Sequence, residues 1–141
     1  MALTCLSLTG STLAENAAAA SLFRGYIDLL ELRADFLSSE ELASLERFPS
    51  MVDIPVILTI RRKRDGGFWN KTEEQRRGLL ERGLSGSYSY VDLEIDFDDE
   101  TLRRLCRQKG ITVIRSLHQF TGVPDNWKKS IDELSKRDDE I

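Results

Sequence analysis

The feature that most constrains the fold is a regular alternation of short apolar runs with helical segments along the chain. The apolar runs are rich in Leu, Val and Ile and end at polar or turn residues, as buried parallel strands do. We expect strands over 3–8, 26–33, 56–61, 88–95 and 111–117. We expect helices over 12–23, 38–48 and 72–84, and further helices from 98 and from Pro124. This order predicts a parallel α/β sheet.

Capping signals support the expected helix starts. Two pairs of residues fit a capping box, Thr12 with Glu15 and Thr72 with Gln75. In a capping box the side chain of each of the two residues accepts a hydrogen bond from the backbone N–H of the other. The acidic run at 98–100 places negative charge where a helix N-terminus favours it. The helices are therefore predicted from their own ends as well as from their spacing.

Two architectures fit the strand count. Each strand–helix unit takes about 28 residues, so eight units would need about 225 residues, within the range of a TIM (β/α)8 barrel. The 141 residues hold five such units and form one domain, 1–141. An open doubly wound sheet of five strands fits as well. No G-x-G-x-x-G follows a strand, so a dinucleotide site has no support.

Composition excludes several classes of function. Twenty basic and 24 acidic residues give a net charge of −4, which argues against nucleic acid as the partner. No apolar run approaches the roughly 20 residues of a membrane span. Cys5 and Cys106 are too few for a disulfide framework, and we expect buried thiols in a reducing, cytoplasmic setting. No His, Cys or carboxylate spacing is typical of a metal site.

Polar residues gather at the carboxyl ends of the expected strands. Ligands of parallel α/β folds bind beyond these ends, and side chains of equal parity share one face of a strand. The residues that share a face in this way are Ser7, Glu31, Arg33, Thr59, Arg61, Asp92, Glu94, Ser116 and His118. Polar groups are costly to bury without partners. The pattern therefore predicts one polar pocket with two arginines, several carboxylates and a histidine.

Each of these residues also has a plain structural interpretation. His118 is the only histidine, and a single strand-end histidine is more often structural than catalytic. Glu31 and Arg33 can form a simple ion pair, and the basic run 61–64 can be a solvated loop. Asp92 and Glu94 can be core carboxylates that a nearby lysine or arginine satisfies. The pocket prediction rests on their common placement rather than on any one residue.

Four segments, in this order, resemble the type I 3-dehydroquinate dehydratase family. They are Glu31-Leu32-Arg33-Ala34-Asp35, Thr59-Ile60-Arg61 with Asp65-Gly66-Gly67, Val91-Asp92-Leu93-Glu94, and Ser116-Leu117-His118-Gln119-Phe120. The resemblance covers the whole chain and roughly the first five of the eight units of the family barrel. It implies the TIM barrel rather than the open sheet.

The resemblance also implies a reaction and roles. The family dehydrates 3-dehydroquinate to 3-dehydroshikimate in the shikimate pathway of aromatic amino acid biosynthesis, without a metal or cofactor. A lysine forms a Schiff base with the substrate ketone, which acidifies the adjacent C–H. His118 matches the histidine that removes this proton and then protonates the leaving hydroxyl, and Asp65 stands where the family has a glutamate that orients the histidine.

The substrate-binding positions of the family also have counterparts here. By resemblance, Glu31, Arg33 and Arg61 bind substrate, and Ser7 and Asp92 match further substrate-binding positions. The arginines would hold the substrate carboxylate in bidentate fashion. The implied partner is therefore the small molecule 3-dehydroquinate, and a homodimer stays open.

One departure concerns the family's Schiff-base lysine, which lies on the sixth strand. The segment 138–141 resembles the lead-in to that strand, and Lys128, Lys129 and Lys136 do not match the lysine. We therefore expect these 141 residues alone to have little or no dehydratase activity. Two alternatives stay open: an inactive half-barrel that binds a carboxylate ligand or oligomerises, and a different barrel enzyme of aldolase-like or phosphate-handling type.

Overall fold

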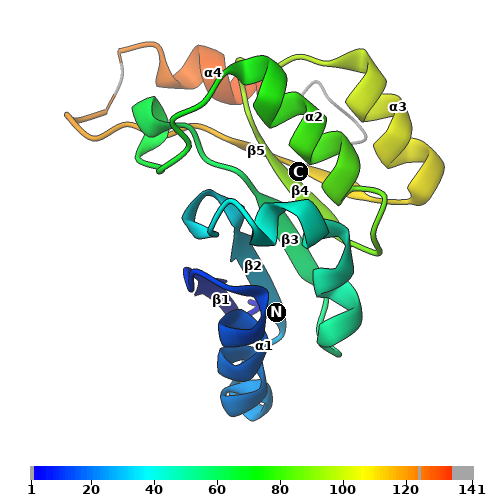
Figure 1. Cartoon of the computed structure of the whole chain (residues 1–141). Helices are drawn as coiled ribbons and strands as arrows, with labels where there is room; N and C mark the ends of the chain where they lie inside the picture. Colours follow the sequence, from blue (N-terminus) through cyan, green and yellow to red (C-terminus); the bar gives the residue numbers. More distant parts are fainter. Residues whose placement is uncertain (1, 124, 135–141) are drawn as a thin grey trace.

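A computed structural model describes residues 2–123 and 125–134 and contains one sheet of five parallel strands (Figure 1). The strands are β1 (Cys5–Leu8), β2 (Leu29–Arg33), β3 (Val56–Thr59), β4 (Tyr90–Glu94) and β5 (Thr112–Ser116). They lie side by side in chain order, and every neighbouring pair is parallel. A doubly wound sheet reverses its strand order at a switch point, and this sheet has no reversal. The order is that of a barrel, as expected from the resemblance.

The first three α-helices begin where the capping signals predict, and α4 begins three residues after the expected Pro124. They are α1 (Leu13–Leu22), α2 (Glu73–Gly83), α3 (Glu100–Lys109) and α4 (Trp127–Leu134). Both expected capping boxes, Thr12 with Glu15 and Thr72 with Gln75, are present. The Asp99 carboxylate accepts the Leu102 N–H at the start of α3. Pro124, the expected start of the last helix, lies outside the described residues.

Two expected elements are wrong. The segment Glu41–Met51 (η3) forms 3₁₀ turns instead of the α-helix expected over 38–48. Ser44 has non-helical angles (φ −120°, ψ 21°), and Pro49 has no N–H to donate to an α-helical ladder. Tyr26 was expected to open a strand, but Arg24–Tyr26 (η1) is a 3₁₀ turn. The strand itself begins at Leu29.

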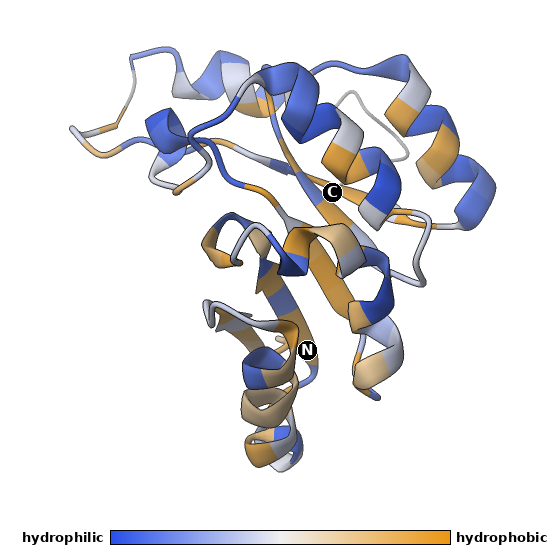
Figure 2. Cartoon of the chain, viewed as in Figure 1, coloured by the Kyte–Doolittle hydropathy of each residue, from blue (hydrophilic) through white to orange (hydrophobic). Residues whose placement is uncertain are grey.

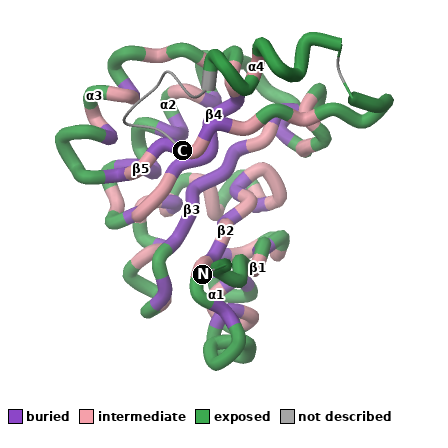
Figure 3. Tube along the Cα trace, turned by 180° about the vertical axis from the view of Figure 1, so that it is seen from behind, coloured by how far each residue is buried: buried purple, intermediate pink, exposed green. Residues whose placement is uncertain are grey.

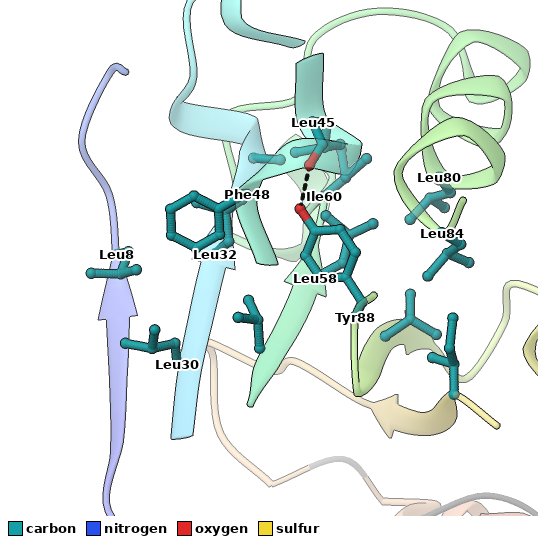
Figure 4. Close-up of a cluster of buried hydrophobic side chains, with 14 of the residues drawn as sticks. Leu8, Leu30, Leu32, Leu45, Phe48, Leu58, Ile60, Leu80, Leu84 and Tyr88 are labelled. Atoms are coloured by element: carbon teal, nitrogen blue, oxygen red, sulfur yellow. Dashed lines mark hydrogen bonds between the residues drawn. The ribbon is translucent and has the colours of Figure 1, made fainter. Parts of the chain in front are cut away.

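The hydrophobic core lies on the face of the sheet that the helices cover. Alternate residues of the central strands, including Leu30, Leu32 and Leu58, are fully buried in one cluster with residues of η3 and α2 (Figure 4). Within it the Tyr88 hydroxyl donates a 2.7 Å hydrogen bond to the Leu45 carbonyl, and burial raises the pKa of Tyr88 strongly. Each such aliphatic side chain contributes about 1.5–3 kcal/mol of burial free energy. This layer fixes the sheet against its helices.

The other face of the sheet carries the polar side chains at the carboxyl ends of the strands. In a barrel of this type it is the face that points inward. Figure 2 shows hydrophilic residues interrupting the hydrophobic strands. In Figure 3 the tube is most deeply buried along the middle of the sheet, around β3 and β4, while much of α1 and α4 is exposed. No helix in the described ranges is long and apolar enough to cross a membrane.

The two cysteines differ in their surroundings. Cys106 on α3 is buried, as expected, but Cys5 is exposed, so the expected burial of Cys5 is wrong. Cys5 belongs to β1, which pairs on one side only, with β2, within the described sheet. Partial burial and the charge of Glu31 together raise the pKa of the Cys5 thiol. An edge position, which local sequence does not reveal, decides this exposure.

Candidate active site

Strand register brings the predicted polar residues together on the inner face. Ser7 pairs with Glu31 across β1 and β2, and Arg33, Thr59 and Asp92 form a continuous row across β2, β3 and β4. Because side chains alternate along a strand, these residues share one face. Both rows lie toward the carboxyl ends of the strands. The predicted gathering of these residues is therefore present in the fold.

Arg61 is the centre of a polar chain across this face. β3 ends at Thr59, so Arg61 follows the strand by two residues instead of lying within it as expected. Its Nη2 donates to Asp92 Oδ2 at 2.6 Å and lies 3.7 Å from Glu31 Oε1. Glu31 in turn accepts a hydrogen bond from the Ser7 hydroxyl. Four predicted site residues from four successive strands are thus linked.

Arg33 is held by a residue that the site prediction missed. Its Nε and Nη2 donate to the two oxygens of Asp35 at 2.9 and 2.8 Å. Asp35 Oδ2 also accepts the backbone N–H of Phe68 at 2.9 Å, and the Phe68 ring lies 4.5 Å from that of Phe36. Asp35 thus ties the end of β2 to the loop after β3. The Glu-x-Arg-x-Asp spacing was a visible signal for its role.

His118 lies two residues beyond β5 and is partly buried. Its Nδ1 is buried and accepts or donates no hydrogen bond within the described ranges. The neighbouring Phe120 packs on the loop after β3, since a Cβ added to Gly66 would lie 2.5 Å from Phe120 Cζ. Gly66 also has a left-handed φ of 78°, which favours glycine. The loops that carry Asp65 and His118 are therefore in contact.

Asp65 itself is paired with an arginine of its own loop. Its Oδ2 accepts a 2.6 Å hydrogen bond from Arg62 Nε. Among residues 2–123 and 125–134 no hydrogen bond joins Asp65 to His118. The contact by which Asp65 would orient His118 stays a prediction. Arg62 is a further neighbour of the site, and the sequence analysis did not identify it.

Glu94 does not line the pocket that the pattern predicted for it. It is buried, and its two oxygens accept from Arg76 Nη1 and Nη2 of α2 at 3.3 and 2.9 Å. Arg76 is fully buried and also donates to the Ile60 carbonyl at 2.9 Å. The alternative of a core carboxylate satisfied by a basic residue is confirmed for Glu94. The pair attaches α2 to the ends of β3 and β4.

Unpartnered polar atoms concentrate on this face. Seven buried side-chain polar atoms of the described residues have no hydrogen-bond partner, and five belong to this face or to the loops that continue it. These five are Thr59 Oγ1, Arg61 Nε, Asp92 Oδ1, Ser116 Oγ and His118 Nδ1. Buried polar groups are nearly always satisfied in folded proteins. The inner face is therefore suited to a polar ligand that supplies both acceptors and donors.

The remaining predicted features lie elsewhere. Lys128 and Lys129 are exposed on α4, where Lys129 lies 3.7 Å from Glu133. Lys136 and the segment 138–141 lie outside the described residues. Within the described part of the chain, no three His, Cys, Asp or Glu side chains gather to hold a metal ion.

The fold and these side chains define the amino-terminal part of a parallel (β/α) barrel with polar side chains on its inner face. A family model described as type I 3-dehydroquinase matches residues 4–141. The chain belongs to this family.

Curated relatives agree with the family assignment. A 3-dehydroquinate dehydratase of Thermococcus gammatolerans is 37% identical over 121 residues, covering 83% of this chain and 54% of the relative. One of Methanococcus maripaludis is 32% identical over 112 residues, covering 77% of this chain and 48% of the relative. The chain thus spans about half the length of these curated relatives.

Solved structures show the same fold. A 3-dehydroquinate dehydratase of Enterococcus faecalis superposes with a TM-score of 0.86 at 20% identity, covering 96% of this chain and 62% of that one. A type I enzyme of Clostridium difficile superposes with a TM-score of 0.81 at 21% identity, covering 95% of this chain and 57% of that one. The expected TIM-barrel class is confirmed, with this chain covering its first five strands.

Proposed function

We propose that this chain is the histidine-bearing part of a 3-dehydroquinate dehydratase, which converts 3-dehydroquinate to 3-dehydroshikimate and water. The observation that carries the proposal is the group of five unpartnered polar atoms on the inner face, which includes His118 Nδ1 and Arg61 Nε. The carboxylate of a hydroxylated carboxylate substrate offers acceptors for the arginine. The hydroxyl groups of such a substrate can bond the carboxylate and the hydroxyls of the protein on this face. The family match supplies the reaction class.

The proposed roles follow from the contacts. Arg61, with Asp92 and Glu31 fixing its guanidinium, receives the substrate carboxylate, and Arg33, fixed by Asp35, supports it. Binding by preoriented arginines needs little reorganisation when the ligand arrives. Ser7 holds Glu31 in place through its hydroxyl. The polar chain across β1 to β4 thus acts as one binding surface.

His118 performs the proton transfers. It takes the proton from the carbon next to the substrate carbonyl and returns it to the departing hydroxyl, so that one water leaves and the histidine ends unchanged. Asp65 orients the imidazole. The barrel's Schiff-base lysine supplies the electron sink, and we propose that residues 1–141 alone have little or no activity. We also propose a reducing, cytoplasmic setting, since two cysteines are too few for a disulfide framework.

A chimera tests this proposal. The chain replaces the matched segment of the Thermococcus gammatolerans relative, and formation of the conjugated product is followed by ultraviolet absorbance. We expect an active chimera, and a loss of about 10²–10⁴-fold in kcat after His118→Ala, the range for a general acid–base group. Gln119→Ala is the matched control, because Gln119 is exposed and, among the described residues, its side chain bonds only Thr121. A His118→Ala chimera of unchanged kcat would overturn the proposed role.

The second candidate function is binding without catalysis. It is favoured by the arrangement of the arginines, since Arg33 and Arg61 are both oriented by residues of this chain. If the chimera folds but lacks turnover while 3-dehydroquinate still binds, the carboxylate-binding half-barrel becomes the better account. Circular dichroism of each chimera establishes that it is folded.

A further inference from the structure

The loop after β3 carries a buried arginine, Arg62, to which the proposed function gives no role. Arg62 is only 8% exposed at its side chain, and three carboxylates surround it. Nε lies 2.6 Å from Asp65 Oδ2 and 3.5 Å from Glu94 Oε1, and Nη2 lies 2.7 Å from Asp96 Oδ1. These carboxylates come from the loop itself and from the end of β4. The guanidinium therefore joins two elements.

The backbone of Arg62 also shapes this loop. Its carbonyl accepts the N–H groups of Asp65 and Gly67, each at 3.0 Å. A Cβ at Gly67 would lie 2.1 Å from the Arg61 carbonyl oxygen, so the chain closes on itself here. Asp65 is thus fixed at both its backbone and one carboxylate oxygen. Its conformational freedom is small before any ligand binds.

Only one oxygen of Asp65 is used in this cluster. Oδ2 is taken by Arg62, and Oδ1 accepts no hydrogen bond within the described ranges. His118 Nδ1 is equally without a partner there, on a loop that packs against Gly66 through Phe120. The two groups that the proposed chemistry must join thus each have an atom that makes no hydrogen bond within the described ranges.

We infer that Arg62 is a positioning residue, which holds Asp65 Oδ2 so that Asp65 Oδ1 is directed to His118. The inference rests on the proposed function, because it assumes that Asp65 orients His118. Asp96 anchors Arg62 in turn. Burial opposes the charge of Arg62, but the hydrogen bonds that Arg62 donates to Asp96 and Asp65 outweigh burial and raise its pKa. Arg62 stays charged throughout the working range, and it holds Asp65 as a fixed carboxylate.

The test uses the single histidine of the chain, whose imidazole Cε1–H proton gives one resonance that NMR follows at fixed pH. We expect Asp65→Asn to shift this resonance, because the imidazole loses the carboxylate that orients it. In an Arg62→Met background the same substitution should have less than half this effect. Any direct effect of the Arg62 charge on His118 is common to both members of each comparison and cancels, so the difference isolates positioning.

Arg64→Met is the matched control. Arg64 also approaches Asp65, at 3.8 Å, and pairs with Asp96, but it is 64% exposed at its side chain. Its cycle with Asp65 should be additive. If Arg62→Met fails to fold, Arg62→Lys replaces it, because a lysine keeps the charge but lacks the planar fork that holds two carboxylates.

The outcomes separate the two proposals. If Asp65→Asn leaves the His118 resonance unchanged in the otherwise unaltered chain, the proposed Asp65–His118 pair is wrong, and the inference falls with it. If Asp65→Asn shifts the resonance equally with and without Arg62, the pair stands and the positioning role of Arg62 is wrong. Full rescue of the Asp65 effect by Arg62→Lys would also overturn positioning, since charge alone would then suffice.

Discussion

Replacement of Arg76 by methionine measures how strongly a buried ion pair attaches α2 to the sheet. Arg76 is fully buried and donates to Glu94, to the Ile60 carbonyl and to Glu73, and its guanidinium lies 4.6 Å from the Phe97 ring centre. Methionine keeps much of the aliphatic volume and removes every donor. The substitution removes both hydrogen bonds from Arg76 to the buried Glu94 carboxylate, which keeps an ion pair with Arg62 at 3.5 Å.

The expected cost follows from the loss of these hydrogen bonds. Removing one partner of a buried pair destabilises a protein by about 3–5 kcal/mol, mostly because the remaining charge cannot be solvated. Arg77, the next residue of the same helix, pairs with Asp99, but it is 40% exposed at its side chain. Arg77→Met should therefore cost much less, because exposed ion pairs contribute little to stability. The two substituted arginines are adjacent in α2 and differ in how deeply their side chains are buried.

Urea unfolding followed by circular dichroism gives both values. We expect Arg76→Met to lower the free energy of unfolding at least three times as much as Arg77→Met. Adding Glu94→Leu to Arg76→Met should recover much of the loss, because it removes the stranded charge. Equal effects of the two arginine substitutions, or no recovery in the double variant, would refute the view that burial of the Arg76–Glu94 pair sets its contribution.

Two further predictions concern thiol reactivity and acid stability. In the native protein an aromatic disulfide reagent should react with Cys5 and not with Cys106. Glu31→Gln should speed the reaction of Cys5 at fixed pH, because Glu31 helps to raise the pKa of this thiol. An unchanged rate would contradict the proximity of Cys5 and Glu31. Partial burial opposes ionisation of Asp99, but hydrogen bonds, chiefly from Arg77, outweigh it and lower its pKa. The stability from Asp99 is thus complete above the unfolded pKa of about 3.9 and is lost as pH falls through the lower folded value. Asp99→Asn should make the free energy of unfolding in urea less dependent on pH below about pH 4. An unaltered pH dependence would contradict this.

Local sequence patterns predicted most of the architecture. Strand positions followed from apolar runs and helix starts from capping residues such as Thr12 and Thr72, because these signals act within a few residues. The errors came where one local signal competed with another. In η3 the conformation of Ser44 and the missing donor of Pro49 outweighed an otherwise helical pattern.

The site was predictable in position but not in its pairing. The alternation of side chains placed Glu31 and Asp92 on one face, and the register confirms this placement. The arginine partners were not visible, because they depend on contacts between distant segments: Arg76 is 18 positions from Glu94, and Arg62 is 34 from Asp96. Parity alone therefore placed Glu94 in the pocket, whereas its partner on α2 makes it part of the core.

Substrate binding on this face is tested by an NMR titration of the 141-residue chain with 3-dehydroquinate, following the Cε1–H resonance of His118, the single histidine. We expect a saturable shift with a dissociation constant of about millimolar magnitude, since only part of the barrel contributes contacts. We also expect Arg61→Met to abolish the shift, because Arg61 receives the substrate carboxylate. A His118 resonance that does not move, or that moves equally in Arg61→Met, would contradict a substrate site on this face.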